Sequence, residues 1–171
     1  MIGALRQHRR RSETAAQLCN AAAARARDPV FYRTLAVADS MDGRFDLLVL
    51  HAWLILGRLQ ELGEHTLAQS FVDALFTRFD EALREQGASD IGIGRRIKKM
   101  ADAFYGRLRA YSESGDANGL ASAILRNVYR GENDRVEQAT LLAKYVDNAR
   151  RQMISSRLDR GEVEFAPISG L

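Results

Sequence analysis

Apolar residues recur along most of the chain three and four residues apart, the spacing of amphipathic helices. This pattern predicts six helices, at about 5–27, 44–62, 65–86, 93–114, 116–130 and from 134 onward, with a short helical piece at 30–38. Strand-like alternation is scarce, and we do not expect residues 163–165 to form a sheet. The prediction is an all-α fold, a single-domain bundle of about six helices around a central apolar one.

The second predicted helix is the one that we expect at the centre. Residues 47–56 are apolar on nearly every side of a helix, and His51 is the interruption. A helix that is apolar all round has to be buried, so its neighbours must surround it. The run is about half of the roughly 20 residues that a membrane-spanning helix needs, and we predict no transmembrane helix.

Polar residues and a proline mark the helix ends. Asp28 and Pro29 end the first helix, because the residue before a proline is pushed out of helical geometry. Asp116 is expected to cap the fifth helix, and Asp134 with Glu137 forms the D-x-x-E arrangement of a capping box for the sixth. We divide the chain into a basic N-terminal helix, 1–27, a helical domain, 28–160, and a C-terminal tail, 161–171.

Composition argues for a reducing compartment and against the familiar metal sites. With one cysteine and three histidines, the chain has no pair for an internal disulfide and lacks the clustered ligands that structural zinc requires. No histidine follows a glutamate at the three-residue spacing of di-iron bundles. We therefore expect no metal and no cofactor, and a cytoplasmic protein, free or peripheral at the inner membrane.

The first turns of the chain carry an excess of positive charge. Glu13 is the only acidic residue before Asp28, and it stands against several arginines, among them Arg6, Arg9, Arg10 and Arg11. Such a start has the composition of a mitochondrial transit peptide and also that of an ordinary amphipathic helix, and it lacks the apolar core of a secretory signal. We predict that these four arginines contact an anionic membrane surface or the ribosome.

Two features suggest catalysis, and each has a plainer explanation. His51 is either a buried histidine with a perturbed pKa or a core side chain bonded to a backbone carbonyl or a polar neighbour. Gly92 and Gly94 suggest a phosphate cradle or a capping loop, and the Walker spacing and a preceding strand are missing. We favour the plainer explanation for both, and predict a protein that is no enzyme and has no catalytic residues or small-molecule substrate.

The fourth predicted helix combines a basic stripe with aromatic residues. Its cations are candidates for binding an acidic partner, RNA or lipid head groups: Arg95, Arg96, Lys98, Lys99 and Arg107. A solvated face paired with carboxylates of neighbouring helices would give the same pattern. The third helix has an apolar stripe wider than one neighbour needs, so aromatic residues of both helices are either walls of an apolar groove or core residues: Phe71, Phe76, Phe104 and Tyr105.

Several stretches of the sequence carry a likeness to a known family. They are residues 28–32, 42–51 and 94–108, of which the last contains the run Lys98-Lys99-Met100-Ala101-Asp102-Ala103-Phe104-Tyr105-Gly106-Arg107. Residues 123–130 add to the likeness, which continues more loosely to residues 145–146 and 160–165. Together these stretches resemble the ubiquinol-cytochrome c chaperone family over about residues 26–130.

That resemblance implies an assembly factor of the cytochrome bc1 complex. Its members act on newly made cytochrome b and, in mitochondria, work close to the translating ribosome with a small partner protein. The implied partners are nascent cytochrome b or another bc1 subunit, the ribosome or an anionic membrane surface, and a small helper protein. The short N-terminal region indicates a bacterial member. The alternative is a general RNA- or ribosome-binding helical module that uses the same cations.

Overall fold

The computed structural model describes residues 2–85, 87 and 90–168, and these residues form helices and connecting segments without a strand. The α-helices are α1 (Ile2–Ala26), α2 (Pro29–Arg33), α3 (Met41–Glu61), α4 (His65–Glu85), α5 (Asp90–Ser112), α6 (Ala117–Val128) and α7 (Val136–Gln152). Three short 3-10 turns are η1 (Asn133–Arg135), η2 (Met153–Ser155) and η3 (Leu158–Arg160). The predicted all-α fold is confirmed.

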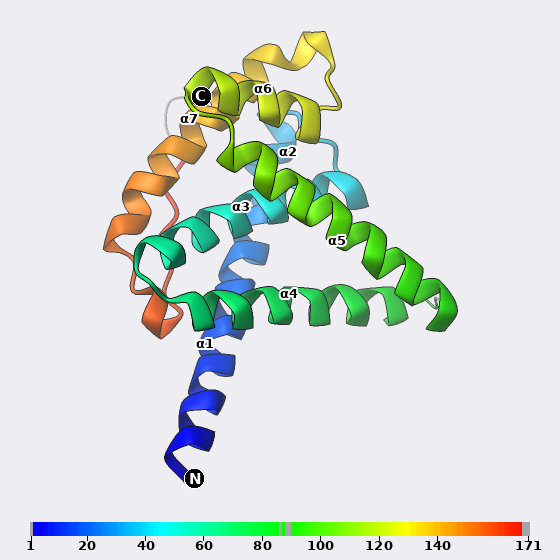
Figure 1. Cartoon of the computed structure of the whole chain (residues 1–171). Coiled ribbons are helices and arrows are strands. Elements are labelled where there is room, and N and C mark those ends of the chain that lie inside the picture. The colour runs from blue at the N-terminus through cyan, green and yellow to red at the C-terminus, as the bar shows by residue number, and fades with distance from the viewer. Residues whose placement is uncertain (1, 86, 88–89, 169–171) are drawn as a thin grey trace.

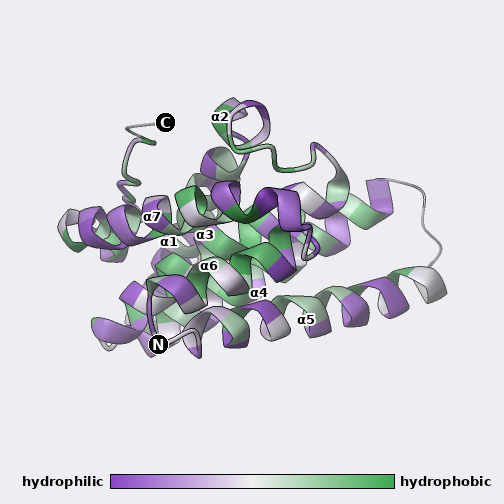
Figure 2. Ribbon diagram, turned by 90° about the horizontal axis from the view of Figure 1, so that it is seen from above, coloured by the Kyte–Doolittle hydropathy of each residue, from purple (hydrophilic) through white to green (hydrophobic). Residues whose placement is uncertain are grey.

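Helix α3 lies at the centre of the bundle and packs against α1, α4, α5, α6 and α7 (Figure 1). Its side chains are buried without a gap from Val49 to Ile55, which confirms the prediction of a central apolar helix. Figure 2 shows the hydrophobic colour concentrated on the inner helices and the hydrophilic colour on outer faces. The helix begins tightly against the preceding loop, because a Cβ on Gly43 would lie 2.0 Å from the carbonyl oxygen of Ala38.

Helices α4 and α5 run antiparallel and diverge from their connection, which includes Gly87 at a φ of +76° (Figure 1). Each of them contacts α3, and they contact each other. The positive φ favours glycine, since other residues are strained there. The three helices therefore enclose a roughly triangular face, with α4 along one edge and α5 along another.

The helix ends agree with the predictions at two places and differ at two. Helix α1 ends at Ala26, next to Asp28 and Pro29 as predicted, and the carboxylate of Asp116 accepts a backbone N–H bond as the predicted N-cap of α6. Asp28 also caps α2, a role that was not predicted. The predicted capping box at Asp134 is wrong, because this residue lies in the 3-10 turn η1 and Arg135, which makes no side-chain cap bond, precedes α7. Helix α2 is shorter than predicted, since the chain turns at Ala36 with a φ of +51°.

The C-terminal segment folds back over the bundle. Residues 162–168 have no regular structure, as expected for 163–165, and residues 169–171 of the predicted tail lie outside the described residues. The Arg25 guanidinium donates to the Ala166 carbonyl at 2.8 Å, and the ring of Phe165 lies edge-on to His51 at 5.1 Å. Residues 162–168 therefore connect α1 to the core of the bundle.

The helices that the structure describes contain no stretch both long and apolar enough to cross a membrane.

Candidate partner-binding surface

Two aromatic rings meet at the surface between α4 and α5. Phe76 stacks on Tyr105, with ring centroids 6.3 Å apart and planes 15° from parallel. Phe76 also makes edge contacts with Phe79 at 5.4 Å and with Phe104 at 5.5 Å. Because Tyr105 is 51% exposed and Phe104 is fully buried, the stack is the outer end of an aromatic cluster that reaches into the core.

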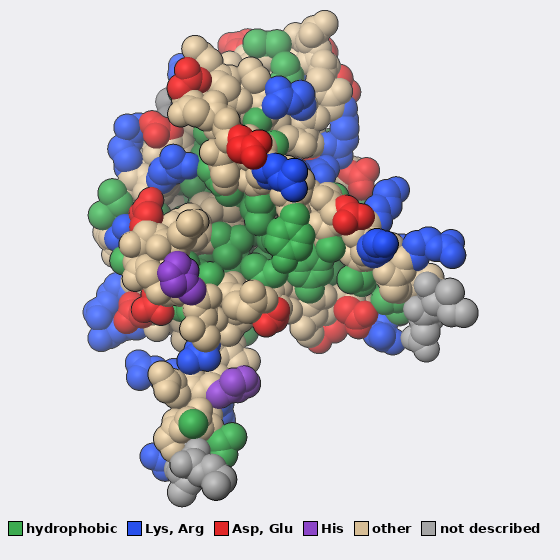
Figure 3. All heavy atoms as spheres, in the orientation of Figure 1, with side chains coloured by type: hydrophobic (Ala, Val, Ile, Leu, Met, Phe, Trp, Pro, Cys, Tyr) green, Lys and Arg blue, Asp and Glu red, His purple; other side chains and the backbone are tan. Residues whose placement is uncertain are grey.

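Hydrophobic side chains surround this stack. Figure 3 shows them gathered between α3, α4 and α5. Val72 lies one turn before Phe76, and Leu108 lies one turn after Tyr105; both are half-buried. We call Val72, Phe76, Tyr105 and Leu108 the apolar face. Contiguous exposed apolar surface usually marks a site for another molecule, because leaving it in water is unfavourable.

Of the four predicted groove walls, Phe76 and Tyr105 lie together at the surface and Phe71 and Phe104 do not. Phe71 has no exposed surface, because it shares the buried stripe of α4 with Leu67 and Leu75. Phe104 is equally buried. The structure corrects the prediction for Phe71 and Phe104, which are core residues here.

The residues of the predicted basic surface also fall into two groups, one exposed and one turned into the protein. Four of its cations are exposed on α5 and form no ion pair with any residue that the structure describes: Arg95, Arg96, Lys98 and Lys99. Arg107 is different, because its guanidinium turns inward and donates to Asp46 of α3 at 2.7 Å. It also lies over the ring of Phe45 at 5.4 Å. Arg107 is therefore a packing and pairing residue, which corrects its prediction as a surface contact.

Asp46 is a buried carboxylate held between two arginines. Its side chain has no exposed surface; Arg107 contacts Oδ1, and the Arg130 guanidinium lies 2.8 Å from Oδ2. Burial raises the pKa of Asp46, and the charges of the two arginines oppose that shift. Arg130 reaches this position with a φ of +56°, which is strained for a residue other than glycine. The sequence alone does not indicate this cluster, since its members come from α3, α5 and the loop after α6.

His51 lies within a chain of buried hydrogen bonds. Its Nδ1 is 2.7 Å from the Leu47 carbonyl, which can only accept, so Nδ1 carries the proton and Nε2 accepts from the Tyr145 hydroxyl at 2.9 Å. That hydroxyl in turn accepts from Arg25 at 3.0 Å. Burial lowers the pKa of His51 from 6.5 to about 4, so the ring is neutral at pH 7. These bonds agree with the prediction of a core histidine bonded to a carbonyl and a polar neighbour.

An open groove that sequence analysis missed lies beside the end of α5. It has a volume of about 460 Å³, and its lining includes Trp53, Gly57, Ser112 and Arg150. The indole N–H of Trp53 donates to Ser112 Oγ at 2.9 Å, and the guanidinium of Arg150 lies 4.8 Å from the ring centroid. Gly57 is the sequence signal that sequence analysis did not use, because a helical glycine one turn after a tryptophan leaves open space beside it.

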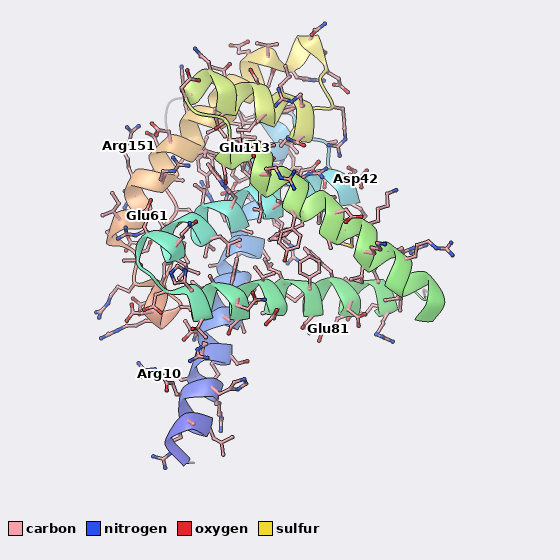
Figure 4. All side chains as sticks on the ribbon, in the orientation of Figure 1. Arg10, Asp42, Glu61, Glu81, Glu113 and Arg151 are labelled. Carbon is pink, nitrogen blue, oxygen red and sulfur yellow. The ribbon has the colours of Figure 1, made fainter. Side chains whose placement is uncertain are left out.

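The first turns of α1 project from the body of the molecule (Figure 1). Arg6, Arg9 and Arg10 are exposed there and Arg11 is half-buried; Figure 4 labels Arg10 on this projecting part. Arg9 forms an ion pair with Glu13 at 2.8 Å. We call residues 2–11 the arm. The predicted membrane or ribosome contact of these arginines stays a prediction.

Comparison with known proteins places the chain among assembly chaperones. The family model described as ubiquinol-cytochrome C chaperone matches residues 33–159. Ubiquinol-cytochrome c reductase complex assembly factor 1 of Mus musculus is 23% identical over 146 residues, which are 81% of this chain and 50% of the mouse protein. The Xenopus laevis protein of the same name is 22% identical over 120 residues, 68% of this chain and 60% of its own length. The chain thus spans about half to three fifths of these relatives.

A solved structure agrees over nearly the whole fold. The crystal structure of the Cbp3 homolog from Brucella abortus matches with a TM-score of 0.80 and 32% sequence identity, and the match covers 98% of each chain. The family model covers most of the helical bundle, from the end of α2 to η3. The chain belongs to the ubiquinol-cytochrome C chaperone family.

Proposed function

We propose that this protein is a non-enzymatic assembly chaperone of the cytochrome bc1 complex that binds newly made cytochrome b. The observation that carries the proposal is the apolar face, where Phe76 and Tyr105 stack at the surface. The choice of complex rests on the relatives of this chain, which are named as assembly factors of the ubiquinol-cytochrome c reductase complex. A newly made apolar helix can bury itself against such a face until it meets its permanent neighbours.

The charged surfaces support a position close to the site of synthesis. Arg95, Arg96, Lys98 and Lys99 of α5 are exposed, and so are three arginines of the arm, Arg6, Arg9 and Arg10. Cations of this kind are attracted to anionic lipid head groups and to ribosomal RNA. We propose that they hold the protein near the inner membrane or the ribosome, with a small helper protein as a further partner.

The test measures capture of newly made cytochrome b. Cells that carry an affinity-tagged chain are pulse-labelled and crosslinked, and the labelled cytochrome b that co-purifies is quantified. Tyr105→Asp places a charge in the apolar face at an exposed position, so we expect capture to fall at least about fivefold, a difference of about 1 kcal/mol. Ile154→Asp is the matched control, because Ile154 is an exposed apolar residue of η2, outside the apolar face.

Equal capture by Tyr105→Asp and the unmodified protein would contradict the proposed role of the apolar face. A deletion strain tests the function as a whole: cytochrome b and the assembled bc1 complex should both fall, and normal amounts of both would contradict it.

The exposed cations Arg95, Arg96, Lys98 and Lys99 of α5, which have no ion-pair partner among the described residues, favour a second candidate, a general RNA- or ribosome-binding module. Such a module would bind RNA without selecting a client, and its affinity would fall steeply as salt rises. The two candidates separate in one experiment, in which ribosomes and newly made cytochrome b are captured at about 50 and 200 mM salt. Loss of both at the higher salt favours the RNA module, whereas salt-resistant capture of cytochrome b favours the chaperone.

A further inference from the structure

The apolar face is bordered by α4 on one side and α5 on the other, which we call its two walls. These walls carry opposite charges. On α4, Asp73 and Asp80 lie three residues before and four residues after Phe76, positions that adjoin it on the helix surface. On α5, Arg109 lies four residues after Tyr105, and Lys98 lies two turns before it. Figure 3 shows acidic side chains along the α4 edge of the hydrophobic surface, and Lys and Arg side chains with some acidic ones among them along α5.

Neighbouring groups leave part of this charge unneutralised. Asp73 accepts a hydrogen bond from the neutral Gln69 amide at 2.8 Å, and it makes no ion pair with a residue within the described ranges. Asp80 is paired with Arg84 at 2.7 Å, so the guanidinium partly neutralises the Asp80 charge. Lys98 and Arg109 likewise have no ion-pair partner in the part of the chain that the structure covers. Asp102 is the one acid between them, which leaves the α5 wall positive.

Asp73 and Arg109 belong to the same end of the apolar face. Since α4 and α5 are antiparallel and Phe76 meets Tyr105, earlier residues on α4 and later residues on α5 both lie toward the end where the helices diverge (Figure 1). A segment lying in this opening would have the carboxylate of Asp73 on one side and the guanidinium of Arg109 on the other. Both side chains are exposed, so they can reach its flanks.

We infer that the apolar face receives an amphipathic helical segment with a basic flank against α4 and an acidic flank against α5, and that these charges fix its direction. A helix that is turned end for end, with its apolar side still against the protein, exchanges its two flanks. Only one of the two directions therefore matches both walls. This inference rests on the proposed function, because it describes how a client segment lies on the surface that was assigned to it.

A synthetic probe tests the direction independently of any natural client. The probe is a helical peptide of about 20 residues, with a leucine-rich face, glutamates along one flank, lysines along the other and a benzophenone at its N-terminus. After photolysis with the full chain, mass spectrometry compares crosslinks toward the two ends of α5, at residues 95–100 and 107–112. Two exposed charge pairs together predict a preference of roughly tenfold for one end. Exchanging the two flanks of the peptide should move the crosslinks to the other end.

The charges of the protein can be exchanged in the same way as the flanks of the peptide. The double substitution Asp73→Lys with Arg109→Glu exchanges the charges of the walls without a change in net charge, and should reverse the preferred end. The control pair Glu137→Lys with Arg126→Glu alters exposed residues on α7 and α6 in the same way and should leave the preference unchanged. About 1 M salt should abolish the preference while labelling of the face persists, because screening weakens the ion pairs and leaves the apolar contact.

The outcomes separate this inference from the proposed function. Equal labelling of both ends, or a preference that survives exchange of either set of charges, overturns the inference and leaves the proposed function in place. A third peptide, with glutamines on both flanks, reports on the apolar face alone. If it labels neither α4 nor α5, the apolar face binds no such segment, and both proposals are wrong.

Discussion

Asp46 and His51 are both fully buried on α3, and Asp46 is held as a charged group whereas His51 is held as a neutral one. The carboxylate of Asp46 lies between the cations of Arg107 and Arg130, whereas the ring of His51 is neutral between a carbonyl and a tyrosine hydroxyl. A buried charge needs a partner charge, and a buried neutral polar group needs only hydrogen bonds. Asp46 therefore depends on its two arginines and His51 on its two hydrogen bonds, and loss of these partners should destabilise the protein.

His51 makes the stability of the protein depend on pH in the acidic range. The pKa of His51 is about 4 in the folded state and near 6.5 in the unfolded chain, so between these values the unfolded state binds a proton that the folded state does not. The stabilisation is complete above pH 6.5 and is lost as the pH falls toward 4, in total about 3 kcal/mol. The free energy of unfolding, measured by urea titration, should fall between pH 7 and pH 4 in both proteins. The fall should be about 3 kcal/mol smaller for His51→Gln than for the unmodified protein. Equal decreases in the two proteins would show that His51 is accessible to protons in the folded state.

Arg107 and Arg95 should respond differently to the same substitution. Arg107→Ala removes one partner of the buried Asp46 carboxylate, which should lower the free energy of unfolding by about 3 kcal/mol. Arg95→Ala removes an exposed cation that has no ion pair with a described residue, and should change the free energy of unfolding by less than about 0.5 kcal/mol. Urea unfolding at pH 7 measures both. A loss from Arg95→Ala as large as that from Arg107→Ala would contradict the assignment of these two residues.

At the scale of elements, helix periodicity could be predicted from the sequence because it is local. The stripe on α4 and the apolar core of α3 are visible in the order of residues alone, and both elements appear close to their predicted bounds. Partner contacts that cross the fold could not be predicted in this way. Arg107 looked like one more cation of the α5 stripe, since nothing in its neighbourhood in sequence indicates Asp46 of another helix.

The prediction of N-caps from the sequence is limited for the same reason, because local sequence does not decide which contacts form in the fold. Asp116 is the predicted N-cap of α6, whereas Asp134, which belongs to the fuller D-x-x-E motif, lies in a 3-10 turn. The motif describes which bonds are available, and the tertiary path of the chain decides which of them form.

Asp116 should therefore stabilise α6 measurably. Its carboxylate accepts the Gly119 N–H at 2.8 Å, so Asp116→Ala should lower the free energy of unfolding by about 1 kcal/mol. Asp134→Ala is the matched control, because Asp134 makes no capping bond, and its effect should stay below about 0.5 kcal/mol. Thermal unfolding of the two variants at pH 7 compares them, and equal effects would contradict the capping role.

At the scale of the whole molecule, the arm and the body differ in how they are held. The side chains of residues 3–10 are exposed, whereas Ala15, Leu18 and Ala22 further along α1 are buried in the core. One continuous helix thus contains a part that packs and a part that projects. The division was not visible in the sequence, where residues 5–27 looked like a single amphipathic helix.

Removal of the arm should leave the stability of the body intact. Deletion of residues 3–10, which make up most of the arm, takes away little buried surface, so the free energy of unfolding should change by less than about 0.5 kcal/mol. Leu18→Ala, which empties a buried position of the same helix, should cost about 3 kcal/mol. Guanidinium titration at pH 7 tests both variants. A large loss from the deletion would show that the arm contacts the body in solution.

The central position of α3 has a kinetic consequence. Five other helices rest on it, so none of them can detach without exposing its apolar surface to water. Amide protons from residues 49–55 should therefore exchange with deuterium only when the whole bundle opens, at rates that report global unfolding. Amides of residues 3–10 should exchange much sooner, since fraying at the free end of α1 is enough to release them.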